Sequence, residues 1–195
     1  MSNRFDGWGG RFIAPIMARM NRAAEREAVD RLAPATDAHI LVLGFGPGVG
    51  IEYLSRQLPQ CRIFGIDPSS AMMAASARRN WKAIASGQVR QEQCTADAIP
   101  VDEACFDGAL AVNTLQLCEP VEDTVRELAR VLRPGGRFVS ITHAWAAEHH
   151  AGTTQKWEGA MVSAFSASHF ETIVAARANA ENGKAVLLMA TRKSI

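Results

Sequence analysis

Three closely spaced glycines are the first residues whose spacing points to chemistry. They lie in Gly44-Phe45-Gly46-Pro47-Gly48, directly after an apolar run and before a segment with helical periodicity. Glycines in such a strand-to-helix turn let the backbone curl closely beneath a ligand. A pyrophosphate-binding turn needs a third small residue at position 49 or 51, where this chain has Val49 and Ile51. The turn therefore favours a nucleoside ligand without a pyrophosphate; the alternative is that the glycines only shape the turn.

Two aspartates follow the next two apolar runs. Asp67 ends the run at 62–66, and a carboxylate at the carboxyl edge of a sheet can accept hydrogen bonds from both hydroxyls of a ribose. Asp97 lies just past the third run, where it can accept a hydrogen bond from the exocyclic amine of an adenine. Each has an alternative role. Asp67, with Ser69, is also placed to cap the following helix, and Asp97 is also typical of a solvated loop.

One histidine is placed for acid–base chemistry. His143 directly follows the fifth expected strand, at the same edge of the sheet as the aspartates, and is the candidate general base. A base is needed only if the group that reacts there must first lose a proton. The alternative is a structural or solvated histidine, because His149 and His150 nearby indicate a polar loop.

Alternating apolar runs and helical patterns position these residues. Strands are expected at 39–43, 62–66, 89–95, 106–112 and 137–142, with helices at 51–58, 71–79 and 120–132 between them. Such alternation predicts a parallel sheet with helices on both faces. Two further strands, 170–176 and 185–191, flank the turn signal Asn182-Gly183 and predict an antiparallel hairpin. The expected fold is an α/β, three-layer Rossmann-like sandwich with a mostly parallel seven-stranded sheet and a C-terminal antiparallel hairpin.

The first 33 residues are expected to form a helical lid over a core at 34–195, the two together making a single domain, 1–195. The pattern at 12–32 predicts an amphipathic helix. Its apolar face would carry Phe12, Ile13, Ile16, Met17, Met20 and Ala24, and its solvated face would carry Arg19, Arg22, Glu25 and Arg26. The segment 144–169 contains Trp145 and Trp157, which would either line a pocket or pack against the core.

Composition restricts the partners. The 195 residues include 48% hydrophobic and 21% charged side chains, with a formal net charge of +1, so nothing in the charge balance calls for nucleic acid. The four cysteines are scattered without zinc spacing, which favours a reduced, metal-free interior. The N-terminus lacks the apolar core of a secretory signal and no later run reaches the length of a membrane span, so the expectation is a cytoplasmic protein without stable membrane insertion.

The motifs, taken in order, resemble those of class I S-adenosylmethionine-dependent methyltransferases, particularly the small UbiE/type 11 group. They are Leu41-Val42-Leu43-Gly44-Phe45-Gly46-Pro47-Gly48, Gly65-Ile66-Asp67-Pro68-Ser69, Ala96-Asp97-Ala98-Ile99-Pro100, Phe106-Asp107 and Leu132-Arg133-Pro134-Gly135-Gly136. With the terminal hairpin, the resemblance covers most of the chain. It implies S-adenosyl-L-methionine as cofactor, S-adenosyl-L-homocysteine as product and methyl transfer to a small-molecule acceptor. A lipophilic acceptor is one alternative, because the helix at 12–32 carries arginines opposite its apolar side chains; the other is an ordinary solvated face.

The resemblance also implies roles for individual residues. The three glycines would line the methionine and ribose part of the cofactor, Asp67 would hold the ribose, and Asp97 would meet the adenine. Asn113 would stand at the edge of the methyl-donor site, where the acceptor pocket begins and where Leu115 and Gln116 would continue the wall. The full cofactor-binding set is Gly44, Phe45, Gly46, Pro47, Gly48, Asp67, Pro68, Met72, Ala96, Asp97, Ala98, Asn113 and Thr114.

One position departs from the family pattern. Many members carry an acidic residue two positions before the first glycine, where this chain has Val42. Two alternatives from other classes remain at this point: a nicotinamide-dependent oxidoreductase, which would use the same sheet and Asp67, and a catalytically inactive cofactor-binding partner protein.

Overall fold

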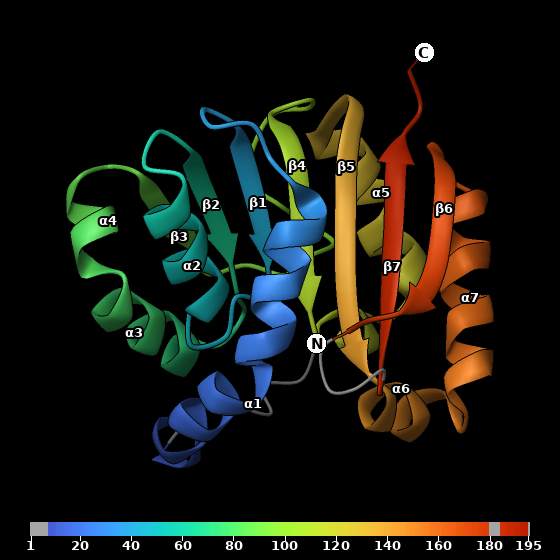
Figure 1. Ribbon diagram of the computed structural model, residues 1–195, viewed down its shortest axis with the longest axis horizontal. Helices are drawn as coiled ribbons and strands as arrows, with labels where there is room; N and C mark the ends of the chain where they lie inside the picture. Colours follow the sequence, from blue (N-terminus) through green and yellow to red (C-terminus); the bar gives the residue numbers. More distant parts are fainter. Residues whose placement is uncertain (1–7, 180–183, 195) are drawn as a thin grey trace.

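The computed structural model describes residues 8–179 and 184–194, with the side chains of 8–13 and 172 left aside. These residues form a seven-stranded sheet in the order β3-β2-β1-β4-β5-β7-β6 (Figure 1). The strands are β1 (His39–Leu43), β2 (Arg62–Ile66), β3 (Val89–Glu92), β4 (Phe106–Val112), β5 (Leu132–His143), β6 (Phe170–Arg177) and β7 (Ala185–Arg192). The first five strands pair in parallel, whereas β7 runs antiparallel to both β5 and β6. The predicted fold class is confirmed; the turn signal Asn182-Gly183 lies outside the described residues.

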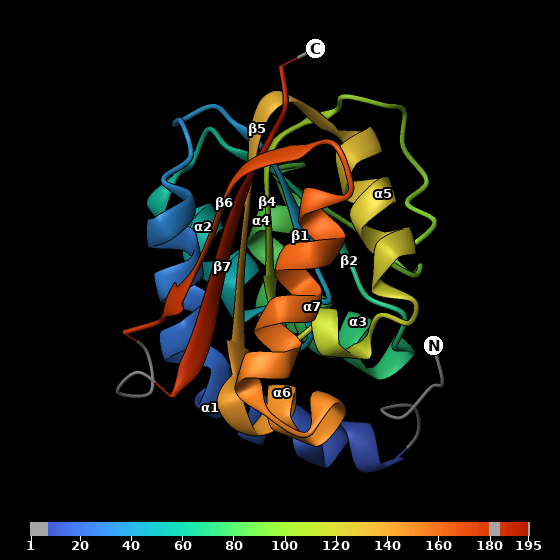
Figure 2. The same cartoon turned by 90° about the vertical axis from the view of Figure 1, so that its right-hand side faces the viewer.

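Helices cover both faces of this sheet and make a three-layer arrangement. They are α1 (Trp8–Leu32), α2 (Val49–Gln57), α3 (Ser70–Arg79), α4 (Trp81–Ala85), α5 (Val121–Val131), α6 (Ala144–Ala151) and α7 (Thr154–Ser166), with a short 3-10 helix η1 (Leu115–Leu117). Figure 2 shows α5 and α7 on one face and α1 and α2 on the other. No helix in the described part of the chain has both the length and the apolarity to cross a membrane.

Strand β1 shows why the sheet forms where the sequence predicts it. Its side chains alternate between two cores: Leu41 and Leu43 pack on the side of α5 and α7, whereas Ile40 and Val42 pack on the side of α1 and α2. All four are buried. A strand covered on both faces reads as a continuous apolar run, which is the pattern of 39–43.

The second half of the chain differs from the sequence-based expectation in two places. Pro134-Gly135-Gly136 lies inside β5 rather than ahead of it, because the register with β4 shifts between Phe106 and Gly108 and absorbs the extra residues. The polar loop expected around His149 and His150 is wrong, since both histidines lie on α6. Helix α7 follows, and its Trp157 is buried in the core, whereas Trp145 on α6 is exposed.

Helix α1 turns a different face to the core than its pattern predicts. Ile16 and Met20 are 60% and 50% exposed, while Ala24 and Ala28 are fully buried against α2 and the sheet. Alanines permit this close approach because they carry no bulk beyond Cβ. Glu25, expected on the solvated face, is only 5% exposed. The second half of α1 is therefore part of the core, and only its first half extends beyond the sheet (Figure 1).

Candidate active site

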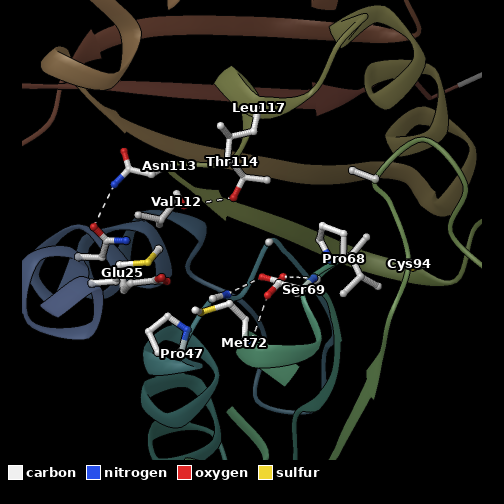
Figure 3. A pocket seen from close by; sticks show the side chains of 17 residues that line it. Glu25, Pro47, Pro68, Ser69, Met72, Cys94, Val112, Asn113, Thr114 and Leu117 are labelled. Atoms are coloured by element: carbon white, nitrogen blue, oxygen red, sulfur yellow. Dashed lines mark hydrogen bonds between the residues drawn. The ribbon is translucent and has the colours of Figure 1, made fainter. Parts of the chain in front are cut away.

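A cavity lies at the carboxyl ends of β1, β2 and β4 (Figure 3). The chain leaves β1 toward β2 on one side and returns to β4 on the other, and open α/β sheets bind ligands at such a reversal of strand order. Nine of the predicted cofactor residues line this cavity: Gly44, Gly46, Pro47, Asp67, Pro68, Met72, Ala96, Asn113 and Thr114. Their grouping follows from the sheet, since eight of them lie in segments that leave the strands at this edge and Met72 lies in the first turn of α3, which follows β2.

The glycine turn forms the floor of the cavity between β1 and α2. Gly44 and Gly46 both have positive φ, 58° and 52°. A Cβ on Gly46 would meet no atom within 4 Å, so this glycine faces open space. A Cβ on Gly44 would lie 2.4 Å from Oγ1 of Thr114, so this glycine lets β1 and β4 approach each other. The two glycines thus have different roles, one toward the cavity and one toward the neighbouring strand.

Asp67 presents its carboxylate to the same space. Its Oδ2 accepts a hydrogen bond from the Gly46 amide at 2.9 Å and its Oδ1 accepts one from the Ser69 amide at 2.9 Å. The cap of α3 is instead Ser69, whose Oγ accepts a bond from the Met72 amide at 3.4 Å. Asp67 is 6% exposed, and two backbone donors hold it in one orientation. Because a carboxylate oxygen can accept more than one hydrogen bond, this arrangement leaves Asp67 suited to a ligand with hydroxyl groups.

Helix α3 braces the outer side of the turn. Arg79 donates from Nε to the Pro47 carbonyl at 2.9 Å and from Nη1 to Glu52 at 2.9 Å. Asn80 donates to the Gly48 carbonyl at 3.1 Å. These bonds hold the loop against α3, so the cavity floor is fixed from behind.

The opposite wall carries two polar side chains, Asn21 on α1 and Asn113 after β4, and His143 at the end of β5 lies behind Asn113. Asn113, whose φ is 51°, accepts the His143 backbone amide on Oδ1 at 2.9 Å and donates from Nδ2 to Asn21 at 3.0 Å. Its Nδ2 also lies 2.6 Å from Nδ1 of His143. Since a backbone amide can only donate, Oδ1 is fixed and Nδ2 must be the donor to the ring. Nδ1 of neutral His143 is therefore an acceptor, and its proton is on Nε2.

His143 stands behind Asn113, which lines the cavity while His143 does not. The ring is buried at the end of β5. Its Nδ1 lone pair is engaged by Asn113 and its Nε2 carries the proton, so the ring as placed holds Asn113 in position. A role as general base stays a prediction.

Four other predicted cofactor residues lie off the cavity surface. Phe45 is buried in the core, and Gly48 faces α3, where a Cβ would lie 2.2 Å from Oγ of Ser76. Asp97 and Ala98 are exposed, and a hydrogen bond from the Thr95 side chain lowers the pKa of Asp97. Their contact with the cofactor stays a prediction.

The wall after β4 also differs from the expected one. Leu115 and Gln116 are buried, and Leu117 on η1 reaches the cavity in their place. Cys94, another lining residue, has its pKa raised to about 11 by burial and by nearby carboxylates, so its thiol stays protonated.

The sequence predicted α1 as a lid over the site but assigned none of its residues to the cofactor-binding set. Met17, Asn21 and Glu25 all line the cavity. Burial alone raises the pKa of Glu25 to about 8. The signal in the sequence is the spacing of Ala24 and Ala28, which lie four residues apart on one helix face and are both buried in the structure; a search for large apolar side chains overlooks it.

Comparison with known proteins identifies the family. Residues 41–140, just over half of the chain, match the family described as "Methyltransferase domain". The chain is also 26% identical to the uncharacterized methyltransferase YdaC of Bacillus subtilis (strain 168). The match extends over 158 residues and covers 81% of this chain and 85% of that protein. Several other relatives are longer, and the chain spans half or less of their length.

Two solved structures share the fold. One is the complex between the Haloferax volcanii Trm112 methyltransferase activator and a putative methyltransferase, with a TM-score of 0.81, 16% identity and 100% of both chains covered. The other is geranyl diphosphate C-methyltransferase of Streptomyces coelicolor A3(2) with S-adenosyl-L-homocysteine, with a TM-score of 0.70, 19% identity and 89% and 77% of the chains covered. With the family match, the glycine turn and the strand order, these findings show that the chain belongs to the S-adenosylmethionine-dependent methyltransferases, in the UbiE/type 11 methyltransferase domain family.

Proposed function

We propose that this methyltransferase acts on a small-molecule acceptor with an apolar part, held between the first half of α1 and the segments that follow β4 and β5. The observation that carries the proposal is the cavity beside Gly46 and Asp67, which is walled by Met17 on α1 and Leu117 on η1. Membership of the methyltransferase family replaces the nicotinamide oxidoreductase alternative.

The cavity residues fit the cofactor. The space above Gly46 admits a ligand close to the backbone, and the carboxylate of Asp67 suits the two hydroxyls of a ribose. Pro68, Met72 and Ala96 give an apolar surface for the adenosine. When bound, S-adenosylmethionine supplies a methyl group on a sulfonium, an electrophile that needs no metal. The task of the chain is then to hold the donor and the acceptor in line and to exclude water.

The surroundings of the cavity favour an apolar acceptor. Large exposed hydrophobic side chains occur on three elements near the cavity: Ile16 and Met20 on α1, Leu117 on η1 and Trp145 on α6. The first half of α1 and helix α6 lie at the same end of the sheet (Figures 1 and 2). The ring of Trp145 stacks near that of His143, 6.3 Å between centroids, and His143 contacts the cavity residue Asn113. Apolar side chains around a pocket with a few polar groups are typical of small-molecule sites.

The polar wall favours catalysis by positioning. Asn113 is held by Asn21 on one side and His143 on the other, so its orientation is set before any ligand arrives. Such a preset group orients an acceptor without taking a proton from it.

Calorimetry and turnover together test the proposal. We expect S-adenosylhomocysteine to bind in the micromolar range, on the order of −7 to −8 kcal/mol, and NADH not to bind. Formation of S-adenosylhomocysteine from S-adenosylmethionine should then be stimulated by an apolar fraction of small molecules extracted from cells and not by the polar fraction. A folded protein that gives no heat or thermal shift with millimolar S-adenosylhomocysteine would contradict cofactor binding. Binding without turnover in any fraction would favour the inactive partner protein.

A further inference from the structure

The cavity has a carboxylate on α1 that the predicted site does not use. The acid usual in the family two positions before the first glycine is replaced by Val42, which is buried on the face of the sheet covered by α1 and α2. Ala24 and Ala28 of α1 pack into the same core as Val42. Glu25 follows Ala24 directly, so α1 brings a carboxylate to the side of the sheet from which position 42 has lost one.

Glu25 points into the cavity at the end away from Pro68 and Cys94 (Figure 3). It is 5% exposed, and within residues 8–179 and 184–194 no hydrogen bond or ion pair reaches its carboxyl group. A buried carboxylate without a partner is costly, and such groups are normally paired. This combination points to a partner that arrives from outside the chain.

The fourth glycine of the turn accommodates this side chain. A Cβ on Gly50 would lie 2.3 Å from Oε2 of Glu25. Gly50 is the second residue of α2, so the carboxyl group of Glu25 lies over the start of that helix, beside the glycine turn. The absence of a side chain at position 50 is what gives Glu25 its place in the cavity wall.

The two ends of the cavity then match the two ends of the cofactor. If Asp67 holds the ribose, and Pro68, Cys94 and Ala96 border the adenosine, the amino-acid end must extend the other way, toward α1. That end of S-adenosylmethionine carries an α-ammonium group, whose preferred partner is a carboxylate. Asn21 and Asn113, also at this end, are neutral.

We propose that Glu25 binds the α-ammonium group of the cofactor and so replaces the acid missing at position 42. The proposal rests on the cofactor placement proposed above. Glu25 is a binding residue in this assignment, and it takes no part in the methyl transfer itself.

Binding measurements with two ligands isolate this contact. S-adenosylhomocysteine and its desamino analogue, which lacks only the α-amino group, are titrated into the wild type and into Glu25→Gln. We expect Glu25→Gln to weaken S-adenosylhomocysteine by 10-fold or more, on the order of a charge-assisted hydrogen bond, and to change the desamino analogue by less than about 2-fold. Asp30→Asn is the matched control, because it removes one carboxylate from the exposed face of the same helix and should leave both affinities unchanged.

A second variant moves the carboxylate and keeps its charge. In Gly50→Ala the new methyl group must displace Oε2 of Glu25, so S-adenosylhomocysteine should again weaken while the desamino analogue does not. Equal losses for the two ligands in either variant would show that Glu25 only shapes the cavity. Unchanged S-adenosylhomocysteine binding in Glu25→Gln would contradict the proposed contact between Glu25 and the α-ammonium group. Failure of the wild type to bind either ligand would instead contradict the proposed function, which keeps the two failures distinct.

Discussion

The two ends of the cavity are held in different ways. At the end near β2, Asp67 is fixed by the backbone amides of Gly46 and Ser69, which lie 21 and 2 residues away in sequence. At the end near α1, the wall is made by side chains from distant segments; Asn21 and Asn113 are 92 residues apart in sequence. Short sequence motifs predict local backbone geometry such as that around Asp67. The wall near α1 depends instead on how whole helices and strands pack.

The ends also differ in electrostatics. The carboxylate of Asp67 accepts hydrogen bonds from backbone amides. No hydrogen bond or ion pair from the described residues reaches the carboxyl group of Glu25, and burial raises its pKa. One charge is thus prepared for its ligand before binding, and the other is stabilised only when a cation arrives. The following predictions test this contrast, from the largest effect to the smallest.

Truncation of α1 separates its two halves. Deleting residues 1–32 removes Ala24, Ala28, Val29 and Leu32 from the core, a loss of more than about 5 kcal/mol that is comparable with the stability of a whole domain. We expect this variant to show no cooperative thermal unfolding. Deleting residues 1–20 should leave the fold and binding of S-adenosylhomocysteine within a few-fold, and should lower turnover by 10-fold or more. Unchanged turnover in the shorter deletion would reject the proposed lid.

Glu25→Gln should change how stability depends on pH. Because the pKa of Glu25 is raised in the folded state to about 8 from 4.5, the folded protein retains a proton that the unfolded chain releases. Wild-type stability should therefore fall as pH rises from about 4.5 to 8, by at most about 5 kcal/mol, and Glu25→Gln should lack this fall.

Denaturant unfolding of the ligand-free protein at pH 5, 6.5 and 8 measures this difference. The other ionisable groups lining the cavity, Asp67 and Cys94, are present in both proteins and cancel in the comparison. Parallel curves for the two proteins would mean that Glu25 is solvated and ionised at neutral pH.

Asp67→Ala should weaken S-adenosylhomocysteine by roughly 1.5–3 kcal/mol, since two ribose hydroxyls would lose a charged acceptor. Asp97→Ala is the comparison and should weaken binding less than Asp67→Ala, because Asp97 is exposed and lies off the cavity. Calorimetry measures both. If Asp67→Ala lowers only the melting temperature, the carboxylate serves the loop and not the ligand.

His143→Gln should lower turnover by less than about 10-fold and leave S-adenosylhomocysteine binding unchanged, since the histidine stands behind Asn113. The measurement is turnover against pH. A loss of about 100-fold, together with disappearance of an ionisation from the pH profile, would instead establish His143 as the general base.

Much of the sheet was predictable because its signals are local. The strands at 39–43, 62–66 and 106–112 were predicted with the observed bounds, since each is an apolar run closed by glycine, aspartate or asparagine. Asp67 and Gly46 were both assigned to the cofactor site because both follow strands of a parallel sheet, and both line the cavity. The cap of α3 is Ser69, which sequence alone left open between two residues.

The residues of α1 that line the cavity could not be predicted, because the buried face of the helix was inferred from its large apolar side chains. The predicted apolar face joined Ile16 and Met20 to Ala24, but of these three only Ala24 is buried. It packs there together with Ala28, because small side chains let the helix approach the sheet closely. Glu25 was assigned to solvent for the same reason. A charged residue is buried only where tertiary contacts enforce it, and no local window of sequence contains those contacts.

The pairing of Gly50 with Glu25 has a consequence for the evolution of this family branch. A Cβ at position 50 would lie only 2.3 Å from Oε2 of Glu25, so a larger residue at 50 and a carboxylate at 25 cannot both keep these positions. Homologues that retain glycine at 50 should retain an acid at 25 when position 42 is apolar. Homologues with an acid at 42 should tolerate larger residues at 50 and uncharged residues at 25. The residues at positions 25, 42 and 50 should therefore covary among homologues.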